Sequence, residues 1–526
     1  MKNLIDIKKN YFYIFLLAYF LIGVYSSINV GITHDEAHSN WVWELNKKKI
    51  DNIFFNNGND ISFLDTYHGY YGVGFYFIST PIEIIFSKLF NFDNINQEGK
   101  ILILKHPTVF IFFILSGIYL KKIIHFVTNN KFFSNLSAIF FLSYPYLFGH
   151  SLFNIKDVPM MSIWIVCTFF LIKILNNYFY NTKIIKKDLI ILSLLTAYLL
   201  SLRISGLLIL LEYLIFLFFY LTVFKINFIN FLRKNFYNLF LFLMVFGAIT
   251  YLFYPSFWHD PTKFIESFLF MSQHIQTVCT KTLGVCMEAQ NLPSSYLFIW
   301  LFFKLPILIL IGLFLFPLVE KKLFFEKKNT LIIAPLLTTI FLIIFLFILF
   351  GVNFYDELRQ VLFLIPLIFI ISLTFLFNFS KKFSIFAMSF FIVFFIFQNL
   401  KIFPYNYLWL NNLNIFLNVQ KNFELDYWGV STKKIAQFIN TQKKNKDICI
   451  ISNRNDGIKY FLKQETRCFK PFNELYLNNK RPFYVALMER SLNKGTPNKC
   501  RIIYKEEIKI NFSKEKIVLG KLYVCN

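Results

Sequence analysis

The N-terminal sequence runs directly from an apolar segment into a cluster of ionisable residues. Residues 11–30 read YFYIFLLAYFLIGVYSSINV, and residues 31–40 read GITHDEAHSN. The first stretch has the length and composition of a membrane-spanning helix, which needs about 20 apolar residues. Ionisable residues at a membrane boundary are costly to place there and are often functional. The sequence therefore predicts a candidate reactive cluster around Asp35 and Glu36, at the point where the first helix leaves the membrane.

The whole chain is too apolar for a soluble protein. Of its 526 residues, 56% are hydrophobic and 16% are charged, which departs strongly from the average soluble composition. The first apolar run is longer than the core of a signal peptide, and no small-residue cleavage pattern follows it. We therefore expect this run to be retained as a helix of a multi-pass membrane protein.

Apolar stretches of spanning length recur as far as residue 400, and they predict about eleven transmembrane helices. They lie near residues 11–30, 105–124, 132–148, 158–175, 189–203, 206–224, 237–254, 294–318, 330–351, 359–378 and 382–400. A further stretch, residues 70–90, contains Pro81 and Glu83. It is predicted to be a juxtamembrane helix that lies in the interface.

The charged loops decide this assignment. If residues 70–90 do not span, every strongly basic loop falls on the same side as the basic N-terminus, which by the positive-inside rule is the cytoplasm. This pattern accounts for the formal net charge of +24 without nucleic acid as a partner. We expect a bacterial inner-membrane protein with a cytoplasmic N-terminus.

The composition changes after residue 400. Apolar runs shorten to strand length, as in DICIIS (447–452) and RPFYVALMER (481–490), and STKKIAQFIN (431–440) has a helical pattern. We predict two domains. Residues 1–400 form the membrane domain, with a first outward loop at 31–104, and residues 401–526 form a small α/β domain on the extracytoplasmic side.

Six of the seven cysteines fall in regions predicted to face outward, in groups of two and four. Disulfides are expected in that oxidising compartment, although reduced thiols in a core are the alternative. The four tail cysteines allow three pairings, among which the sequence does not choose. The disulfide candidates are Cys279, Cys286, Cys449, Cys468, Cys500 and Cys525.

Polar clusters recur on the same predicted outer face. They are GHSLFNIKDVPM (149–160), YPSFWHDPTKF (254–264), NFYDELRQ (353–360) and the isolated Arg203. Any one of them could be an interface anchor, but their convergence predicts a single site. With His34 and His38, the candidate binding residues are Lys156, Asp157, Arg203, His259, Asp260 and Arg359.

These residues carry a resemblance to a known family. The Asp35-Glu36 pair after the first span, followed by Asp-x-Pro at 157–159, resembles the GT-C glycosyltransferases. The similarity is to the branch of protein O-mannosyltransferases and lipid A aminoarabinose transferases. It extends to about residue 440 through five further stretches, FNIKDVPM (153–160), YPSFWHDP (254–261), LPSSYLFIWLFFKLPI (292–307), YDELRQVLFLIP (355–366) and FELDYWGVS (423–431).

The resemblance implies an all-α, polytopic GT-C fold and a hexosyl or pentosyl transferase. Such an enzyme moves a sugar from a polyprenyl-phosphate donor in the membrane to an acceptor hydroxyl at the outer face, by a single displacement with inversion. The acceptor class, a protein or a lipid-linked glycan of the cell envelope, stays open. A divalent metal is not favoured for this branch, although the oligosaccharyltransferases of the same superfamily require one.

The chemistry of such a transfer assigns roles to the candidates. Asp35 is the predicted base for the acceptor hydroxyl, with Glu36, His34 and His38 tuning or orienting it. The phosphate leaving group needs fixed cations, for which the candidates are Lys156, Arg203 and Arg359. Asp157 is predicted to bind the acceptor or sugar hydroxyls, or to ligate a divalent ion with Asp35. His259 and Asp260 are predicted to reach the sugar or the phosphate, although Asp-Pro is also a common signal for the start of a helix. Tyr427 and Trp428 could stack on a sugar or seal the tail on the membrane part.

Two other readings stay open. A multi-pass transporter or flippase would also have many spans and ionisable residues, although the sequence shows no repeat between its halves. A ligase of undecaprenyl-linked glycans would share the donor face. Turnover of a simple polyprenyl-monophosphate sugar separates these readings, because a transporter would not catalyse it and a ligase would need the larger donor.

Overall fold

The computed structural model describes residues 2–90, 92, 95–181, 183–272, 279–442, 449–453, 455–463, 469–471, 483–488, 500–510 and 515–525. Most of these residues are helical. The helices are α1 (Lys2–Ile28), α2 (His34–Phe55), α3 (Gly74–Ser87), α4 (Gln97–Thr128), α5 (Lys131–Ser143), α6 (Pro145–Ser151), α7 (Asp157–Asn181), α8 (Lys186–Leu202), α9 (Ile209–Phe224), α10 (Phe228–Lys234), α11 (Phe236–Phe253), α12 (Lys263–Ser272), α13 (Tyr296–Lys304), α14 (Ile307–Phe314), α15 (Phe316–Phe325), α16 (Lys327–Leu349), α17 (Ile365–Phe379), α18 (Lys381–Ile402), α19 (Val419–Asn422), α20 (Thr432–Thr441) and α21 (Asn455–Lys459).

The chain is an integral membrane protein. Within the described residues, eight helices are long and apolar enough to cross a membrane, and a ninth span is formed if α13 and α14, bent by 115°, count as one. All eleven stretches expected from the sequence are helical. Two of these stretches form helices too short to be counted among the nine spans: α5, with 13 residues, and α8, with 17 residues. Helix α3 has only 14 residues and therefore does not reach the length of a span.

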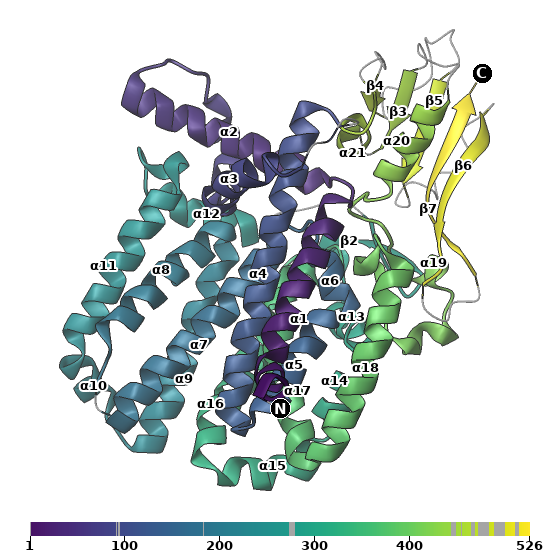
Figure 1. Ribbon diagram of the computed structural model, residues 1–526. Coiled ribbons are helices and arrows are strands. Elements are labelled where there is room, and N and C mark those ends of the chain that lie inside the picture. Colours follow the sequence, from purple (N-terminus) through teal and green to yellow (C-terminus); the bar gives the residue numbers. More distant parts are fainter. Residues whose placement is uncertain are drawn as a thin grey trace.

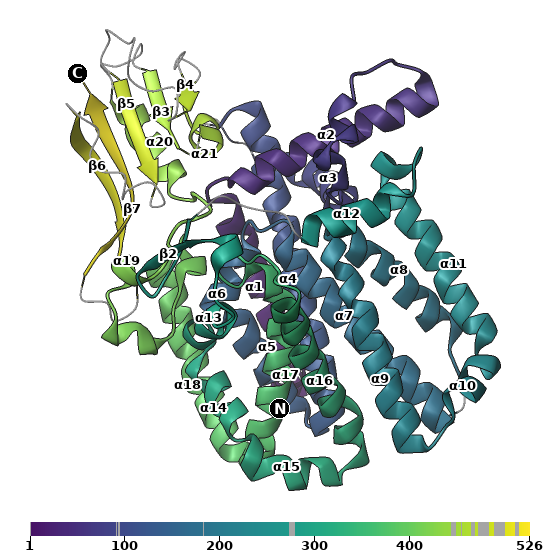
Figure 2. The same ribbon diagram turned by 180° about the vertical axis from the view of Figure 1, so that it is seen from behind.

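The elements at the two ends of the bundle differ (Figure 1). Helices α2, α3 and α12 lie at the upper end, on the same side as the C-terminal sheet, whereas α10, α15 and the N-terminus lie toward the lower end. The view from behind shows α2 and the sheet projecting from that upper end, apart from each other (Figure 2).

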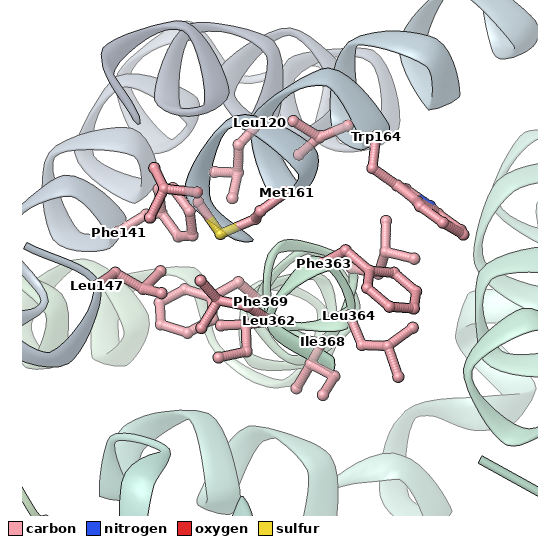
Figure 3. Packing of buried hydrophobic residues seen from close by; sticks show 14 of the residues in the cluster. Leu120, Phe141, Leu147, Met161, Trp164, Leu362, Phe363, Leu364, Ile368 and Phe369 are labelled. Atoms are coloured by element: carbon pink, nitrogen blue, oxygen red, sulfur yellow. The ribbon is translucent and has the colours of Figure 1, made fainter. Parts of the chain in front are cut away.

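Helix α17 forms the centre of the bundle. It is apolar on all sides, as expected for a helix with no face to solvent or lipid, and every residue from Ile365 to Leu376 is buried. Side chains of α17 and of the preceding turn η6 (Arg359–Leu364) pack against α4, α5, α6 and α7 (Figure 3), where Trp164 and Phe363 stack with ring centroids 4.2 Å apart. By contrast, no residue of α11, all of which the structure describes, is buried.

A five-stranded sheet forms the C-terminal part, which confirms the predicted small α/β unit. Its order is β4-β3-β5-β7-β6, in which β3 pairs in parallel with β4 and β5, and β7 pairs antiparallel with β5 and β6. The strands are β3 (Cys449–Ser452), β4 (Phe469–Pro471), β5 (Phe483–Met488), β6 (Cys500–Ile508) and β7 (Ile517–Cys525). Helix α20 packs on the sheet through Ile435 and Ala436.

Residues between α18 and α20 pack with the membrane part. Tyr407, Leu425 and Trp428 belong to the same hydrophobic core as α17, whereas Ile435 and Ile450 belong to another. The two cores do not divide at a single point of the sequence, because Ile517 of β7 belongs to the first and Ile103 of α4 to the second. The domain boundary at residue 400 stays a prediction made on composition.

Apart from Cys167, the cysteines that the structure describes lie on strands. Cys279 and Cys286 form a disulfide across the hairpin of β1 (Cys279–Thr282) and β2 (Val285–Glu288). Cys500 and Cys525 are directly opposite each other on β6 and β7, with Cα atoms 4.2 Å apart, and are also joined. Cys449 is disulfide-bonded, and Cys468 lies outside the described residues. Cys167 is a buried free thiol.

Candidate active site

Arg359 lies at the start of the central helix and contacts three carboxylates. Its Nη2 donates to Asp35 Oδ2 at 2.5 Å, its Nη1 to Asp356 Oδ2 at 2.8 Å and its Nε to Asp157 Oδ2 at 3.2 Å. The side chain is only 6% exposed. A planar guanidinium can bond to several acceptors in one plane, which a lysine ammonium cannot do in the same way. The buried Arg359 therefore holds together the starts of α2 and α7 and its own loop.

Asp157 is the first residue of α7, and both of its carboxylate oxygens have partners. Arg203, in the break between α8 and η3 (Ile204–Leu208), forms an ion pair with its Oδ1, opposite Arg359 on Oδ2. Asn154 donates from Nδ2 to Asp157 Oδ2 at 3.0 Å and accepts from the Asp157 backbone N–H at 2.9 Å. The negative charge of an acidic residue in the first turn also interacts favourably with the helix dipole. Asp157 thus fixes the positions of both guanidinium groups.

Lys156 is the third cation of the site, and it lacks a carboxylate partner. Its Nζ lies 4.7 Å from the centre of the Tyr71 ring, and within the described chain no carboxylate oxygen lies within 4.0 Å of it. Burial lowers the pKa of Lys156, and the nearby Asp35 acts in the opposite direction. Lys156 therefore lies in the site without a direct ion pair to any described carboxylate.

Together these six side chains form what we call the charge cluster. It consists of Asp35, Lys156, Asp157, Arg203, Asp356 and Arg359. The three acids and three bases give it no formal net charge. Burial opposes ionisation of Asp35, but Arg359 and Lys156 outweigh it and hold the pKa of Asp35 well below its usual range. Asp35 is therefore a carboxylate at every physiological pH.

Glu36 points away from the charge cluster. Its Oε1 accepts hydrogen bonds from the backbone N–H and the hydroxyl of Thr33, both at 2.8 Å, and so caps α2. Its Oε2 lies 2.6 Å from His106 Nε2 on α4. Glu36 is 1% exposed and His106 is fully buried.

The two flanking histidines differ. His38 lies beside the charge cluster, with Nε2 3.1 Å from His68 Nδ1 and its ring packed edge-on against Tyr71. Burial, with smaller effects of Lys156 and other cations, lowers the pKa of His38 to about 4. His34 begins α2 next to Asp35 and is exposed.

The structure does not bring His259 and Asp260 to the charge cluster. They lie in the loop after η4 (Pro255–Phe257), where His259 is exposed. The carboxylate of Asp260 accepts from the backbone N–H of Thr262 at 3.1 Å and from its hydroxyl at 2.5 Å. This is an Asx turn, in which an aspartate bonds to the residue two positions on, just before α12, and it accounts for Asp260 by local contacts.

Two residues of the site were not selected from the sequence. Asp356 contacts Arg359, and it is followed by Glu357; both have a left-handed backbone, with φ of 58° and 64°. Non-glycine residues rarely adopt this conformation. Glu357 is held by Lys304 Nζ at 2.8 Å and, through its N–H, by the Tyr296 hydroxyl at 2.9 Å. No local sequence signal marks two successive left-handed residues without glycine.

The aromatic ring of Trp428 packs against the charge cluster. The Arg359 guanidinium carbon lies 4.2 Å from the centre of the Trp428 ring, a cation–π contact. The turn that carries Trp428 is tied by Asp426, whose Oδ1 accepts from the Val430 N–H at 2.8 Å. The DYWG stretch therefore places an aromatic ring against Arg359.

The described residues contain no group of three or more histidine, cysteine, aspartate or glutamate side chains arranged to hold an ion. The three carboxylates of the charge cluster face guanidinium groups instead.

Known proteins offer little beyond this geometry. No family model and no curated protein sequence matches the chain. Among solved structures, ArnT from Cupriavidus metallidurans in the apo state aligns over 98% of each chain with 10% identity and a TM-score of 0.48. The same protein bound to undecaprenyl phosphate aligns over 98% of each chain with 11% identity and a TM-score of 0.46. At such low identities and TM-scores, neither similarity is evidence for a substrate or a mechanism.

Proposed function

We propose that the chain is a GT-C-type glycosyltransferase. It takes a hexosyl or pentosyl group from a polyprenyl-phosphate donor and transfers it to an acceptor hydroxyl at the outer face of the membrane. The observation that carries this proposal is the arrangement of Asp35 against Arg359 and Lys156 at one end of the bundle. A carboxylate beside two cations is what displacement of a phosphate by a hydroxyl needs. The sequence resemblance names the same residues.

The cations would bind the donor phosphate. Negative charge on that phosphate grows as its bond to the sugar breaks, so fixed cations stabilise the transition state more than the ground state. Lys156 has no ion pair to give up in the described chain. Arg359 and the 23% exposed Arg203 would supply further positive charge once their carboxylates are partly displaced.

Asp35 would act as the base only after the donor binds. A carboxylate whose pKa lies well below the usual range is a weak base. When the donor phosphate takes over Arg359 Nη2 and Lys156, Asp35 loses the partners that hold its pKa down, while its burial remains. Its pKa then rises, and it becomes a competent proton acceptor for the acceptor hydroxyl.

The proposed step balances as a single displacement. The acceptor oxygen attacks the anomeric carbon, its proton moves to Asp35, and the bond from the anomeric carbon to the phosphate oxygen breaks. The electron pair of that bond leaves with the polyprenyl phosphate. Attack on the face opposite the phosphate inverts the anomeric configuration.

The placement of charge supports an outward-facing site in this proposal. Asp35 is in the first turn of α2, which lies at the same end of the bundle as the sheet, and α10 and α15 lie at the other end (Figure 1). Helix α10 carries Arg233 and Lys234, and α15 carries Lys321 and Lys322. The positive-inside rule puts these basic turns in the cytoplasm and the charge cluster on the opposite side.

Release of polyprenyl phosphate from radiolabelled polyprenyl-phosphate sugars tests the proposal. The purified protein in detergent would be given hexosyl and pentosyl donors, with and without EDTA. We expect turnover in the wild type and a loss of roughly 10²–10⁴-fold in Asp35→Asn, with donor binding retained. Glu44→Gln, an exposed carboxylate on the same helix, is the matched control and should keep full activity.

The outcomes separate the candidate functions. Equal turnover in Asp35→Asn and the wild type would remove Asp35 as the base. No turnover with any monophosphate donor would contradict the proposed reaction and put the transporter and ligase readings ahead. Loss of turnover in EDTA would show a metal requirement that this proposal does not contain.

A further inference from the structure

We infer that Glu36 is a positioning residue and not a second catalytic carboxylate: its buried pair with His106 aims the neighbouring Asp35 at the charge cluster. This inference rests on the proposed function, since it concerns the same site. It is carried by three contacts that tie the start of α2 to α1 and α4.

The first step is the position of the pair. Glu36 and His106 are buried, and their contact at 2.6 Å joins the first turn of α2 to the first third of α4. The other ring nitrogen of His106, Nδ1, lies 2.9 Å from the carbonyl oxygen of Ser27 at the end of α1. Glu36 Oε1 receives both Thr33 bonds of the helix cap. One carboxylate therefore fixes the chain between α1 and α2 at both ends.

The second step is the location of the protons. The Ser27 carbonyl can only accept a hydrogen bond, so Nδ1 of His106 must carry a hydrogen. The short contact on the other side of the ring needs a further proton between Nε2 and Glu36 Oε2. The pair therefore carries no net charge, whichever of the two partners holds that proton. A carboxylate already in this state cannot serve as an open base without breaking the helix cap or the contact with α4.

The third step links the pair to Asp35. Asp35 and Glu36 are consecutive residues in the first turn of α2, and their side chains leave the helix toward different partners, Arg359 and His106. The capping box and the His106 contact set both the helix start and its rotation. A displacement of about 1 Å at a reacting group can lower the rate about 10²-fold.

The contacts predict that glutamine can replace glutamate here. In Glu36→Gln, the amide oxygen can accept both Thr33 bonds, and the amide N–H can donate to a neutral His106 Nε2. His106 keeps its Nδ1 hydrogen for Ser27, so every hydrogen bond of the pair is retained without charge. Alanine retains none of these bonds. A positioning role is thus rescued by glutamine, whereas a base or nucleophile is not.

The experiment compares Glu36→Gln and Glu36→Ala in the donor-release assay, with the exposed Glu44→Ala on the same helix as control. We expect Glu36→Gln to keep kcat within about threefold of the wild type. Glu36→Ala should lose about 10²-fold in kcat with little change in KM, and Glu44→Ala should behave as the wild type. A Glu36→Gln enzyme that folds and is as inactive as Asp35→Asn would overturn the inference, as would a fully active Glu36→Ala.

A second measurement needs no donor and so separates this inference from the proposed function. Amide hydrogen exchange of the peptide covering residues 30–40 reports on the helix start. Protection should be unchanged in Glu36→Gln and reduced in Glu36→Ala. If the wild type turns over no donor, the proposed function fails while this comparison still decides whether Glu36 fixes α2. Equal protection in all variants would contradict the positioning role.

Discussion

Arg359 and Asp35 are 324 residues apart in the chain, and their side chains meet at 2.5 Å. The contact joins the first turn of α2 to the turn that opens the central helix α17. Arg359 also reaches Asp157 and Asp356, so one guanidinium connects distant segments of the sequence. The site exists only when the whole bundle has assembled.

Removing Arg359 should destabilise the protein. Arg359→Met would leave three carboxylates without this partner, and breaking a buried ion pair from one side costs roughly 3–5 kcal/mol. Arg359→Lys keeps the charge but not the planar fork, and should lie between the wild type and Arg359→Met. Thermal unfolding in detergent measures this. Lys48→Met, at an exposed position of α2, is the control, and an Arg359→Met midpoint equal to that of the wild type would contradict the structure.

Removing Lys156 should affect binding and not folding. The ammonium has no ion pair within the described residues, so Lys156→Met leaves no carboxylate without a direct partner. We expect the unfolding midpoint to stay near that of the wild type. Binding of radiolabelled polyprenyl phosphate should weaken roughly 10- to 100-fold, the usual value of a charged hydrogen bond, and Lys156→Arg should recover part of it. Unchanged binding in Lys156→Met would exclude it from the phosphate site.

Stability should fall in mild acid because of His38. Its pKa is lowered from 6.5 to about 4, chiefly by burial, so the unfolded chain takes up this proton at a higher pH than the folded protein does. The free energy of unfolding therefore decreases as the pH falls from about 6.5 toward 4. Asp35 should add nothing in this range, because its pKa lies well below it and its contribution is present above the unfolded value. Unfolding midpoints between pH 7.5 and 5 should fall less in His38→Asn than in the wild type, and identical slopes would contradict this assignment.

Cysteine labelling can test the orientation. Ser62→Cys, in the loop after α2, should react with a membrane-impermeant maleimide added outside spheroplasts. Lys382→Cys, in the first turn of α18 at the other end of the bundle, should react only after lysis. Of the native cysteines, Cys167 is buried, and Cys279, Cys286, Cys500 and Cys525 form disulfides, so these five should not react with the reagent. The reverse pattern would place the charge cluster in the cytoplasm.

Much of the fold could be predicted from the sequence, because spans are set by length and composition alone. The eleven apolar stretches became helices, and the short C-terminal runs became a sheet. The break between α13 and α14 was not expected, although Lys304 and Pro306 stand at the bend within one apolar run. The apolar pattern of a segment predicts that it is a helix, but it does not predict where a buried cation breaks that helix in two.

The site was predictable by residue type and less so by partner. The sequence named five of the six members of the charge cluster, because charged side chains are few in the loops predicted to face outward. It could not show that Glu36 turns toward His106, since that histidine lies within an apolar run. Nor could it separate the local role of Asp260 from a binding role. Those distinctions depend on the direction of side chains, which residue order does not encode locally.

The left-handed backbone at Asp356 and Glu357 has a consequence for sequence variation. Asparagine, aspartate and glycine tolerate positive φ, whereas β-branched residues do not. Position 356 also needs an acceptor for Arg359, and position 357 needs one for Lys304. Among relatives that share this site, drift at position 356 should be confined to aspartate and asparagine, and exchanges at position 357 should be accompanied by exchanges at position 304.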